Sequence, residues 1–129
     1  MLLAFLSFVI AFLDFFSILF LMINNNTMLS STNLGAVWSF RSSLPHTAWS
    51  KMNVSINDAS MVSFGGVDAY RSTNSGNSFT LINGWADYYS NPATKLHADI
   101  MEIEYFKKAD NTEFAIINCH GGTYVSYDN

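Results

Sequence analysis

The sequence is poor in charged residues, in cysteine and in the short motifs that mark common enzyme classes. Only 12% of its 129 residues are charged, about half the usual share. Its six Lys and Arg residues form no basic run and leave a net charge of −4, which argues against nucleic-acid binding. Gly-rich phosphate loops, HExxH helices and nucleophile elbows are absent from the sequence, so the enzyme classes that they mark are not indicated.

Cys119 is the only cysteine, so neither an intrachain disulfide nor a cysteine-based zinc site can form. We expect it to be a buried free thiol that packs as a small hydrophobic residue. A catalytic thiol is the alternative. His120 follows it directly, but neighbours on a strand point to opposite faces, which weakens the alternative.

The sequence is rich in apolar side chains, and it begins with an apolar run. Half of all residues are hydrophobic and 16% are aromatic, enough for one domain with a real core. Residues 1–23 have the length of a membrane anchor or a secretory signal. No Lys or Arg occurs before Arg41, and Asp14 in the middle of the run would be costly in lipid.

Two buried strands are the other interpretation of this run. Residues 8–13 and 18–23 would form them, with a weak turn between. A wrongly assigned start is a third possibility. We therefore treat 1–17 as a separate apolar segment, either strand or signal and anchor, and 18–129 as the main domain.

A short pattern occurs three times in the chain. It reads Ser-x-Asn/Asp and continues in two copies as x-Gly-x-x-Trp/Phe. The serines are 41 and 54 residues apart, and the first spacing matches the roughly 40–45-residue period of a four-stranded propeller blade. Its members are Ser31, Asn33, Gly35 and Trp38, then Ser72, Asn74, Gly76 and Phe79, then Ser126 and Asp128, after which the sequence ends.

These residue types suit a tight turn between two strands. The Asn or Asp oxygen can accept backbone N–H bonds, and the Ser hydroxyl can add another. Glycine supplies a positive φ without steric cost, and the aromatic ring can pack over the turn. The pattern therefore predicts a structural role for all its members.

Short β-prone runs surround each copy, namely 37–40, 61–64, 79–82, 100–106 and 113–118. Turn-rich pieces separate these runs, which indicates an all-β fold. No amphipathic helix is predicted after residue 24. In 101–105, Glu102 and Glu104 alternate with apolar residues, so we expect them on a solvated face.

The three copies resemble the Asp-box, or BNR, repeat family. Stretches 65–74, 83–85, 95–100 and 121–126 are most similar to sortilin-like receptors and exported bacterial repeat proteins. The resemblance implies a partial β-propeller of about two to three four-stranded antiparallel blades, with the remaining blades of a larger propeller as partners. It also implies a secreted or cell-surface protein of the bacterial envelope, of the kind exported by type IX secretion. Asn replaces the usual Asp in the first two copies.

The loop 84–96 is the most unusual stretch. Aromatic rings beside a carboxylate can bind a sugar ring. Functional residues also concentrate on loops held by a rigid scaffold. We therefore predict contact with a glycan or protein ligand here, with packing over the blade rim as the alternative. The candidates are Trp85, Asp87, Tyr88 and Tyr89.

His97 and Asp99 would share one face of a strand and could form a polar network there. A metal ion needs more ligands, and only His46 and His120 remain as further histidines. We include His97 and Asp99 among the ligand-binding candidates and expect neither metal nor cofactor.

Two functions remain open. The first is a non-catalytic propeller domain for binding or scaffolding. The second is a glycan-cleaving propeller of the xyloglucanase type, which needs two carboxylates at a defined separation; Asp68, Asp87 and Asp99 are the candidates, and Asp68 and Asp99 the weak catalytic ones. A sialidase is disfavoured because Arg41 and Arg71 are the only arginines for a substrate carboxylate.

Overall fold

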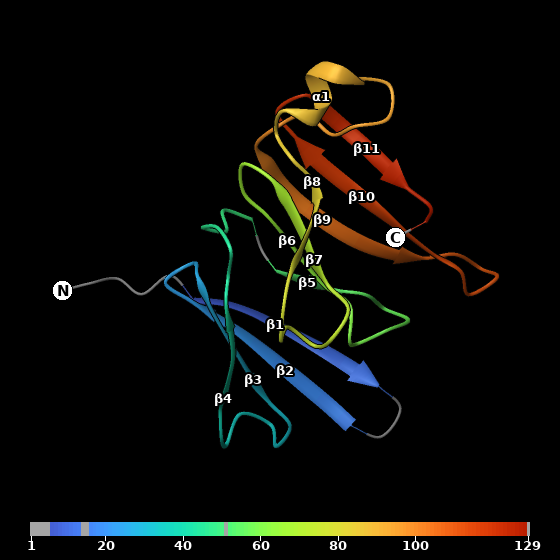
Figure 1. Cartoon of the computed structure of the whole chain (residues 1–129). Helices are drawn as coiled ribbons and strands as arrows, with labels where there is room; N and C mark the ends of the chain where they lie inside the picture. The colour runs from blue at the N-terminus through green and yellow to red at the C-terminus, as the bar shows by residue number, and fades with distance from the viewer. Residues whose placement is uncertain (1–5, 14–15, 51, 129) are drawn as a thin grey trace.

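Three antiparallel sheets make up the part of the chain that the computed structural model describes, residues 6–13, 16–50 and 52–128 (Figure 1). In each sheet, strands consecutive in sequence are neighbours. Sheet I contains β1 (Leu6–Leu13), β2 (Phe16–Ile23), β3 (Thr27–Ser31) and β4 (Ser39–Ser43). Sheet II contains β5 (Asn53–Val54), β6 (Val62–Gly65), β7 (Ala69–Ser72) and β8 (Thr80–Asn83). Sheet III contains β9 (Ile100–Lys107), β10 (Glu113–Cys119) and β11 (Gly122–Ser126).

The predicted all-β class is confirmed, and most strands lie where the sequence places them. Strands β1 and β2 occupy the described part of the apolar N-terminal run. The predicted runs do not include β3, β7 and β11, the strands that lead into the three boxes. They also leave out the two-residue strand β5 and the single helical turn α1 (Asp87–Ser90). No helix in residues 6–13, 16–50 and 52–128 is long and apolar enough to cross a membrane.

Sheets I and II repeat the same register in their last two strands. Met28 pairs with Ser42 and a bulge follows. Ala69 pairs with Asn83 and a bulge follows at the same point. We call each copy of the repeated pattern a box. Met28 and Ala69 each lie three residues before the serine that begins a box, Ser31 or Ser72, so the two hairpins are equivalent residue by residue.

Each copy of the box begins at the last residue of the third strand in its sheet. These residues are Ser31 in β3, Ser72 in β7 and Ser126 in β11. Val37 and Trp38, which the sequence placed in a strand, belong to the first turn instead. The pattern is thus tied to one position of the repeated sheet.

The first box is closed by hydrogen bonds between nearby residues. The Ser31 hydroxyl accepts from Gly35 N at 2.9 Å and donates to Asn33 Oδ1 at 2.8 Å. Asn33 Oδ1 also accepts from Val37 N at 2.8 Å. Leu34 and Gly35 have φ of 58° and 87°, the positive pair typical of a type I′ turn.

The second box repeats this geometry. Ser72 Oγ accepts from Gly76 N at 2.9 Å, and Asn74 Oδ1 accepts from Ser78 N at 3.0 Å. In the third, Ser126 Oγ donates to Asp128 Oδ1 at 2.9 Å. The same local bonds therefore arise from the same residue types in each place where the structure describes them.

Two hydrophobic clusters hold the sheets together. The first joins sheets I and II; its buried members are Phe20, Met22, Met28, Leu44, Ala48, Met52, Ala59, Val62, Phe64 and Tyr70. The second joins sheets II and III; its buried members are Ala69, Ile100, Ile103, Ala115, Ile117 and Cys119. Sheet II therefore has a core on both faces. Cys119 is a buried free thiol.

Sheets II and III approach closely at Gly65. A Cβ on Gly65 would lie 2.4 Å from Ile100 Cγ2. The hydroxyls of Ser63 and Tyr105 lie 2.6 Å apart across the same interface. Burial raises the pKa of the Tyr105 hydroxyl above its usual value, although the hydrogen bond with Ser63 acts in the opposite direction.

A buried carboxylate adds a polar link between these two sheets. Glu113 at the start of β10 is 9% exposed. It accepts from the Ser55 hydroxyl at 2.9 Å and from Asn57 N at 3.1 Å. Sequence reasoning missed Glu113, because its partners are more than 50 residues away in the chain.

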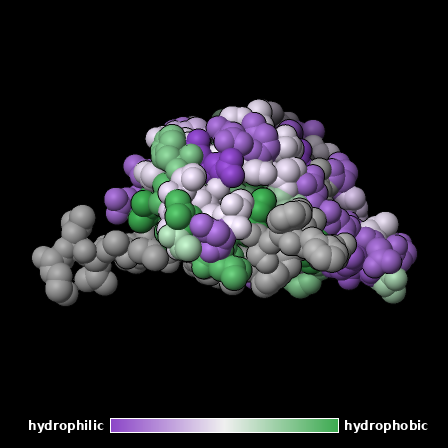
Figure 2. Space-filling model, turned by 90° about the horizontal axis from the view of Figure 1, so that it is seen from below, coloured by the Kyte–Doolittle hydropathy of each residue, from purple (hydrophilic) through white to green (hydrophobic). Residues whose placement is uncertain are grey.

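Hydrophobic side chains also remain on the surface. Seen from the side of sheet I, hydrophobic residues lie among hydrophilic ones (Figure 2). Leu34, Val37 and Phe40, in the first box and β4, are exposed.

Candidate functional site

The loop between β8 and β9 is held at both ends by one side chain. Asn83 is 5% exposed. Its Oδ1 accepts from Leu96 N at 3.0 Å, and its Nδ2 donates to Leu96 O at 3.1 Å. This amide thus closes residues 84–96 into a clasped loop. Sequence reasoning missed it; the only signal was an Asn at the end of a strand, next to Gly84.

Two of the candidate carboxylates anchor the beginning of this loop. Asp68 Oδ1 accepts from Trp85 N at 2.6 Å, and Asp87 Oδ2 accepts from Gly84 N at 3.0 Å. The donors are consecutive residues, so the structure brings Asp68 and Asp87 to one end of the loop. Both carboxylates stabilise the turn through backbone hydrogen bonds.

Aromatic rings form a cluster on the clasped loop. Tyr88 and His97 lie edge to face with centroids 4.9 Å apart. Tyr89 contacts both Trp85 at 6.2 Å and Tyr88 at 5.8 Å. Trp85 is 52% and Tyr89 69% exposed. We call these four side chains, Trp85, Tyr88, Tyr89 and His97, the aromatic cluster.

The helical turn α1 positions two of the four rings, those of Tyr88 and Tyr89. It begins after Ala86, and Asn91 ends it by donating its backbone N–H to Asp87 O and Tyr88 O. Tyr88 is half-buried against His97, whereas Tyr89 points to solvent. The cluster therefore has a packed inner half and an open outer half.

His97 and Asp99 have different partners. His97 Nδ1 lies 3.1 Å from Ala98 O. Asp99 Oδ2 lies 3.0 Å from His120 Nδ1, and Asp99 has a φ of 62°. In the described part of the chain, no group of three or more His, Cys, Asp and Glu side chains could hold a metal ion.

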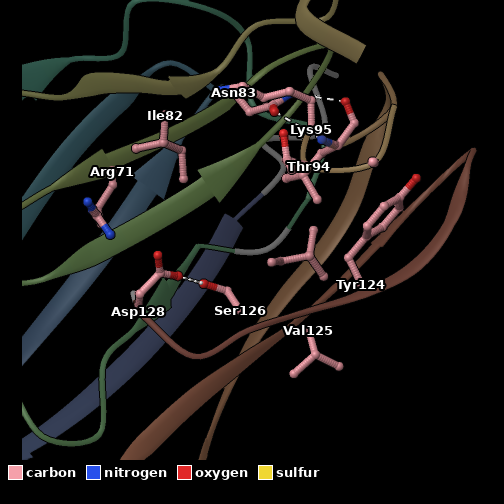
Figure 3. Close-up of a pocket in the computed structure, with 12 residues that line it drawn as sticks. Arg71, Ile82, Asn83, Thr94, Lys95, Tyr124, Val125, Ser126 and Asp128 are labelled. Carbon is pink, nitrogen blue, oxygen red and sulfur yellow. Dashed lines mark hydrogen bonds between the residues drawn. The ribbon is translucent and has the colours of Figure 1, made fainter. Parts of the chain in front are cut away.

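An open groove of about 430 Å³ lies next to the loop, between sheets II and III (Figure 3). Arg71 and Ile82 line it from sheet II, and Ser126 and Asp128 line it from the third box. Thr94 and Lys95 of the loop close one end. None of the aromatic cluster lines this groove, so the two features are separate surfaces.

The chain matches no protein-family model, and comparison with curated proteins and with solved structures gives no significant match. The geometry makes the aromatic cluster the candidate binding site, because its rings lie edge to face on an anchored loop and two of them are exposed. The boxes, by contrast, use their polar side chains within their own turns.

Proposed function

We propose that this chain is a non-catalytic repeat domain of the β-propeller type, in which sheets I, II and III are successive blades. The observation that carries the proposal is the shared register: each sheet is a meander, and each box starts at the end of the third strand. Packing of sheet II on both neighbours supports it further, because propeller blades pack face to face around an axis.

The domain binds its ligand through the aromatic cluster. Trp85 and Tyr89 offer apolar ring faces and edges at low entropic cost, because Asn83 and the two aspartates already fix the loop. The C–H face of a neutral sugar ring packs on such surfaces. We therefore infer a glycan ligand, bound and not cleaved.

Titration with soluble neutral oligosaccharides tests this function. Calorimetry with xyloglucan, cellulose and mannan fragments should detect saturable binding to at least one of them. Trp85→Ala and Tyr89→Ala should each weaken it at least tenfold. Phe40→Ala is the matched control, since Phe40 is an aromatic residue that is 62% exposed but lies in β4 of sheet I, at the opposite end of the molecule from α1 (Figure 1). Equal loss in all three variants, or no binding, would contradict the proposal.

Glycoside hydrolysis is the second candidate, and one observation favours it. Asp68 and Asp87 accept from consecutive amides beside Trp85, so two carboxylates meet next to an aromatic surface. Catalysis needs them about 5–10 Å apart and free to act on substrate. Release of reducing sugar by the wild type, abolished by Asp68→Asn and by Asp87→Asn, would establish this function in place of simple binding.

The proposed domain works outside the cell, as the resemblance of its boxes implies. Residues 1–23 are then either a leader or anchor, or the first two strands of sheet I. The structure has β1 and β2 within this run, which supports the second alternative. Fractionation of cells expressing the chain tests the anchor, because an anchor would retain the chain with the membranes.

A further inference from the structure

A small pocket lies on sheet I, where β3 and β4 flank the first box. Its volume is about 250 Å³, below the roughly 300–1,000 Å³ of sites for drug-sized ligands, so it suits a small chemical group. The described residues that line it are one cation, one apolar side chain and four hydroxyl or amide side chains, and none of them carries a carboxylate: Ser30, Thr32, Asn33, Val37, Ser39 and Arg41.

Arg41 supplies the charge of this pocket. It is the only Lys, Arg, Asp or Glu in residues 16–50. Its Nε donates to Ser30 Oγ at 2.6 Å and its Nη1 to Asn77 Oδ1 at 3.4 Å. Both partners are neutral, and Arg41 makes no ion pair with a carboxylate in the described part of the chain. The register places Ile82 at this position in sheet II, so the repeated sheet does not require a cation there.

The outer end of the guanidinium is left for a ligand. A guanidinium has five N–H donors, and the bonds to Ser30 and Asn77 use two of them. The other donors lie in the fork between Nη1 and Nη2, which binds two oxygens of an oxyanion at once.

The buried hydroxyl of Ser30 adds a second donor. Ser30 is 2% exposed and lines the pocket, and its oxygen accepts from Arg41 Nε. Its own O–H has no acceptor among the residues that the structure describes. A buried donor without an acceptor is unfavourable, and an oxygen of an anion in the pocket would supply that acceptor.

The first box differs from the second by one more donor. In the second box, Asn74 Nδ2 donates to the Ser78 hydroxyl at 2.9 Å. The equivalent residue of the first box is Val37, which has no hydroxyl. Asn33 Nδ2 therefore has no side-chain partner within the described residues, and Asn33 and Val37 both line the pocket.

We propose that this pocket binds the tetrahedral oxyanion of a sulfate or phosphate ester. Its donors come from β3, from the first box and from β4, so they can reach three oxygens that point in different directions, whereas a carboxylate has only two in one plane. A sulfate ester has a single negative charge, which one guanidinium balances, and a phosphate ester has about −1.5 to −2. We therefore expect the sulfate ester to bind more tightly.

Amide resonances of the isotope-labelled full chain report this binding. The probes are glucose sulfate, glucose phosphate, glucuronate and glucose, titrated at constant ionic strength with sodium chloride. Glucose sulfate should shift the amides of residues 30–41 saturably. Glucuronate, which carries the same charge on a planar group, should bind at least about threefold more weakly, and glucose should cause no shift there. Tighter binding of the phosphate than of the sulfate would identify the phosphate ester as the ligand of the same site.

Asn33→Asp is the sharpest variant, because it keeps the oxygen that accepts from Val37 N and places a negative charge in the pocket. It should weaken binding of glucose sulfate at least about tenfold. Asn74→Asp is the matched control, since it makes the same change in the second box and Asn74 does not line the pocket. Arg41→Lys keeps the charge but loses the fork, and should weaken binding at least about threefold.

Any of three results would overturn the proposal. The first is the absence of a saturable shift in residues 30–41 with either ester. The second is equal affinity for glucuronate and for the esters, which would leave only nonspecific attraction to a cation. The third is an equal effect of Asn33→Asp and Asn74→Asp. The pocket shares no lining residue with the aromatic cluster, so these results do not depend on whether a neutral glycan binds at Trp85.

Discussion

At the scale of single residues, each complete box is stabilised by hydrogen bonds between residues two to four positions apart in the chain. The Asn33 oxygen accepts from a backbone amide four residues ahead, so the sequence spacing alone determines the partner. Glu113 and Asn83 were not predictable in this way. The carboxylate of Glu113 meets Ser55 across a sheet interface, and Asn83 meets Leu96 across a loop. Neither contact can be inferred from the spacing of these residues in the sequence.

The oxygen of Asn74 should be the part of that side chain on which stability depends. Asn74→Asp keeps the oxygen that accepts from Ser78 N. Asn74→Ala removes this oxygen, so Ser78 N and the Ser72 hydroxyl both lose their acceptor. We expect the alanine variant to lose about 1–2 kcal/mol of unfolding free energy and the aspartate variant less than half of that. Urea denaturation measures both. Asn33→Asp and Asn33→Ala should repeat the difference, and equal loss for Asp and Ala would contradict it.

Tyr105 should make stability depend on alkaline pH. Burial raises its pKa in the folded protein, so the folded state holds the phenolic proton more tightly than the unfolded chain. Its contribution is complete below the unfolded pKa of about 10 and is lost as pH rises beyond it. Wild-type stability, followed by denaturation from pH 8 to about 11, should therefore fall more steeply than that of Tyr105→Phe. Parallel curves would show that this hydroxyl ionises equally well in both states.

At the scale of elements, the sequence located most strands but not the shape of the loop between β8 and β9. Period-two alternation in β9 predicted a solvated face for Glu102 and Glu104, but both are half-buried in the structure. Ile103 between them is buried, whereas Met101 on the same face of the strand is 53% exposed. The helical turn α1 spans four residues, too few to show a helical period. The aromatic content of the loop was visible in the sequence. Its edge-to-face arrangement depends on the clasp by Asn83, which only the structure reveals.

Removing the clasp should loosen the loop without unfolding the sheets. Asn83→Ala loses both hydrogen bonds to Leu96, and the amide of Leu96 is then left without its acceptor. We expect exchange of that amide to accelerate at least about tenfold, which corresponds to about 1.4 kcal/mol. Hydrogen exchange followed by NMR measures it. Thr94→Ala, an exposed change within the same loop, should leave the rate unchanged; acceleration in both variants would assign the effect to the loop in general.

At the scale of the whole molecule, apolar composition predicted a core but not its division into two. The division follows from sheet II, which turns Val62 and Phe64 to one neighbour and Ala69 to the other. Small residues on the second face let sheet III approach closely. A single sequence shows which positions alternate, but it does not show which sheet each face will meet.

The close approach at Gly65 should therefore control how sheets II and III pack. In Gly65→Ala the new Cβ would lie 2.4 Å from Ile100 Cγ2 and 2.9 Å from Ile100 O, so backbone as well as side chain must move. We expect a loss of about 2–3 kcal/mol, typical of overpacking, and a weaker Ser63–Tyr105 hydrogen bond. Thermal unfolding measures the first and the alkaline titration of Tyr105 the second. Gly84→Ala is the matched control, because its nearest neighbours would lie at an ordinary 3.6 Å. If both variants unfolded at the same temperature, the two sheets would not depend on this contact.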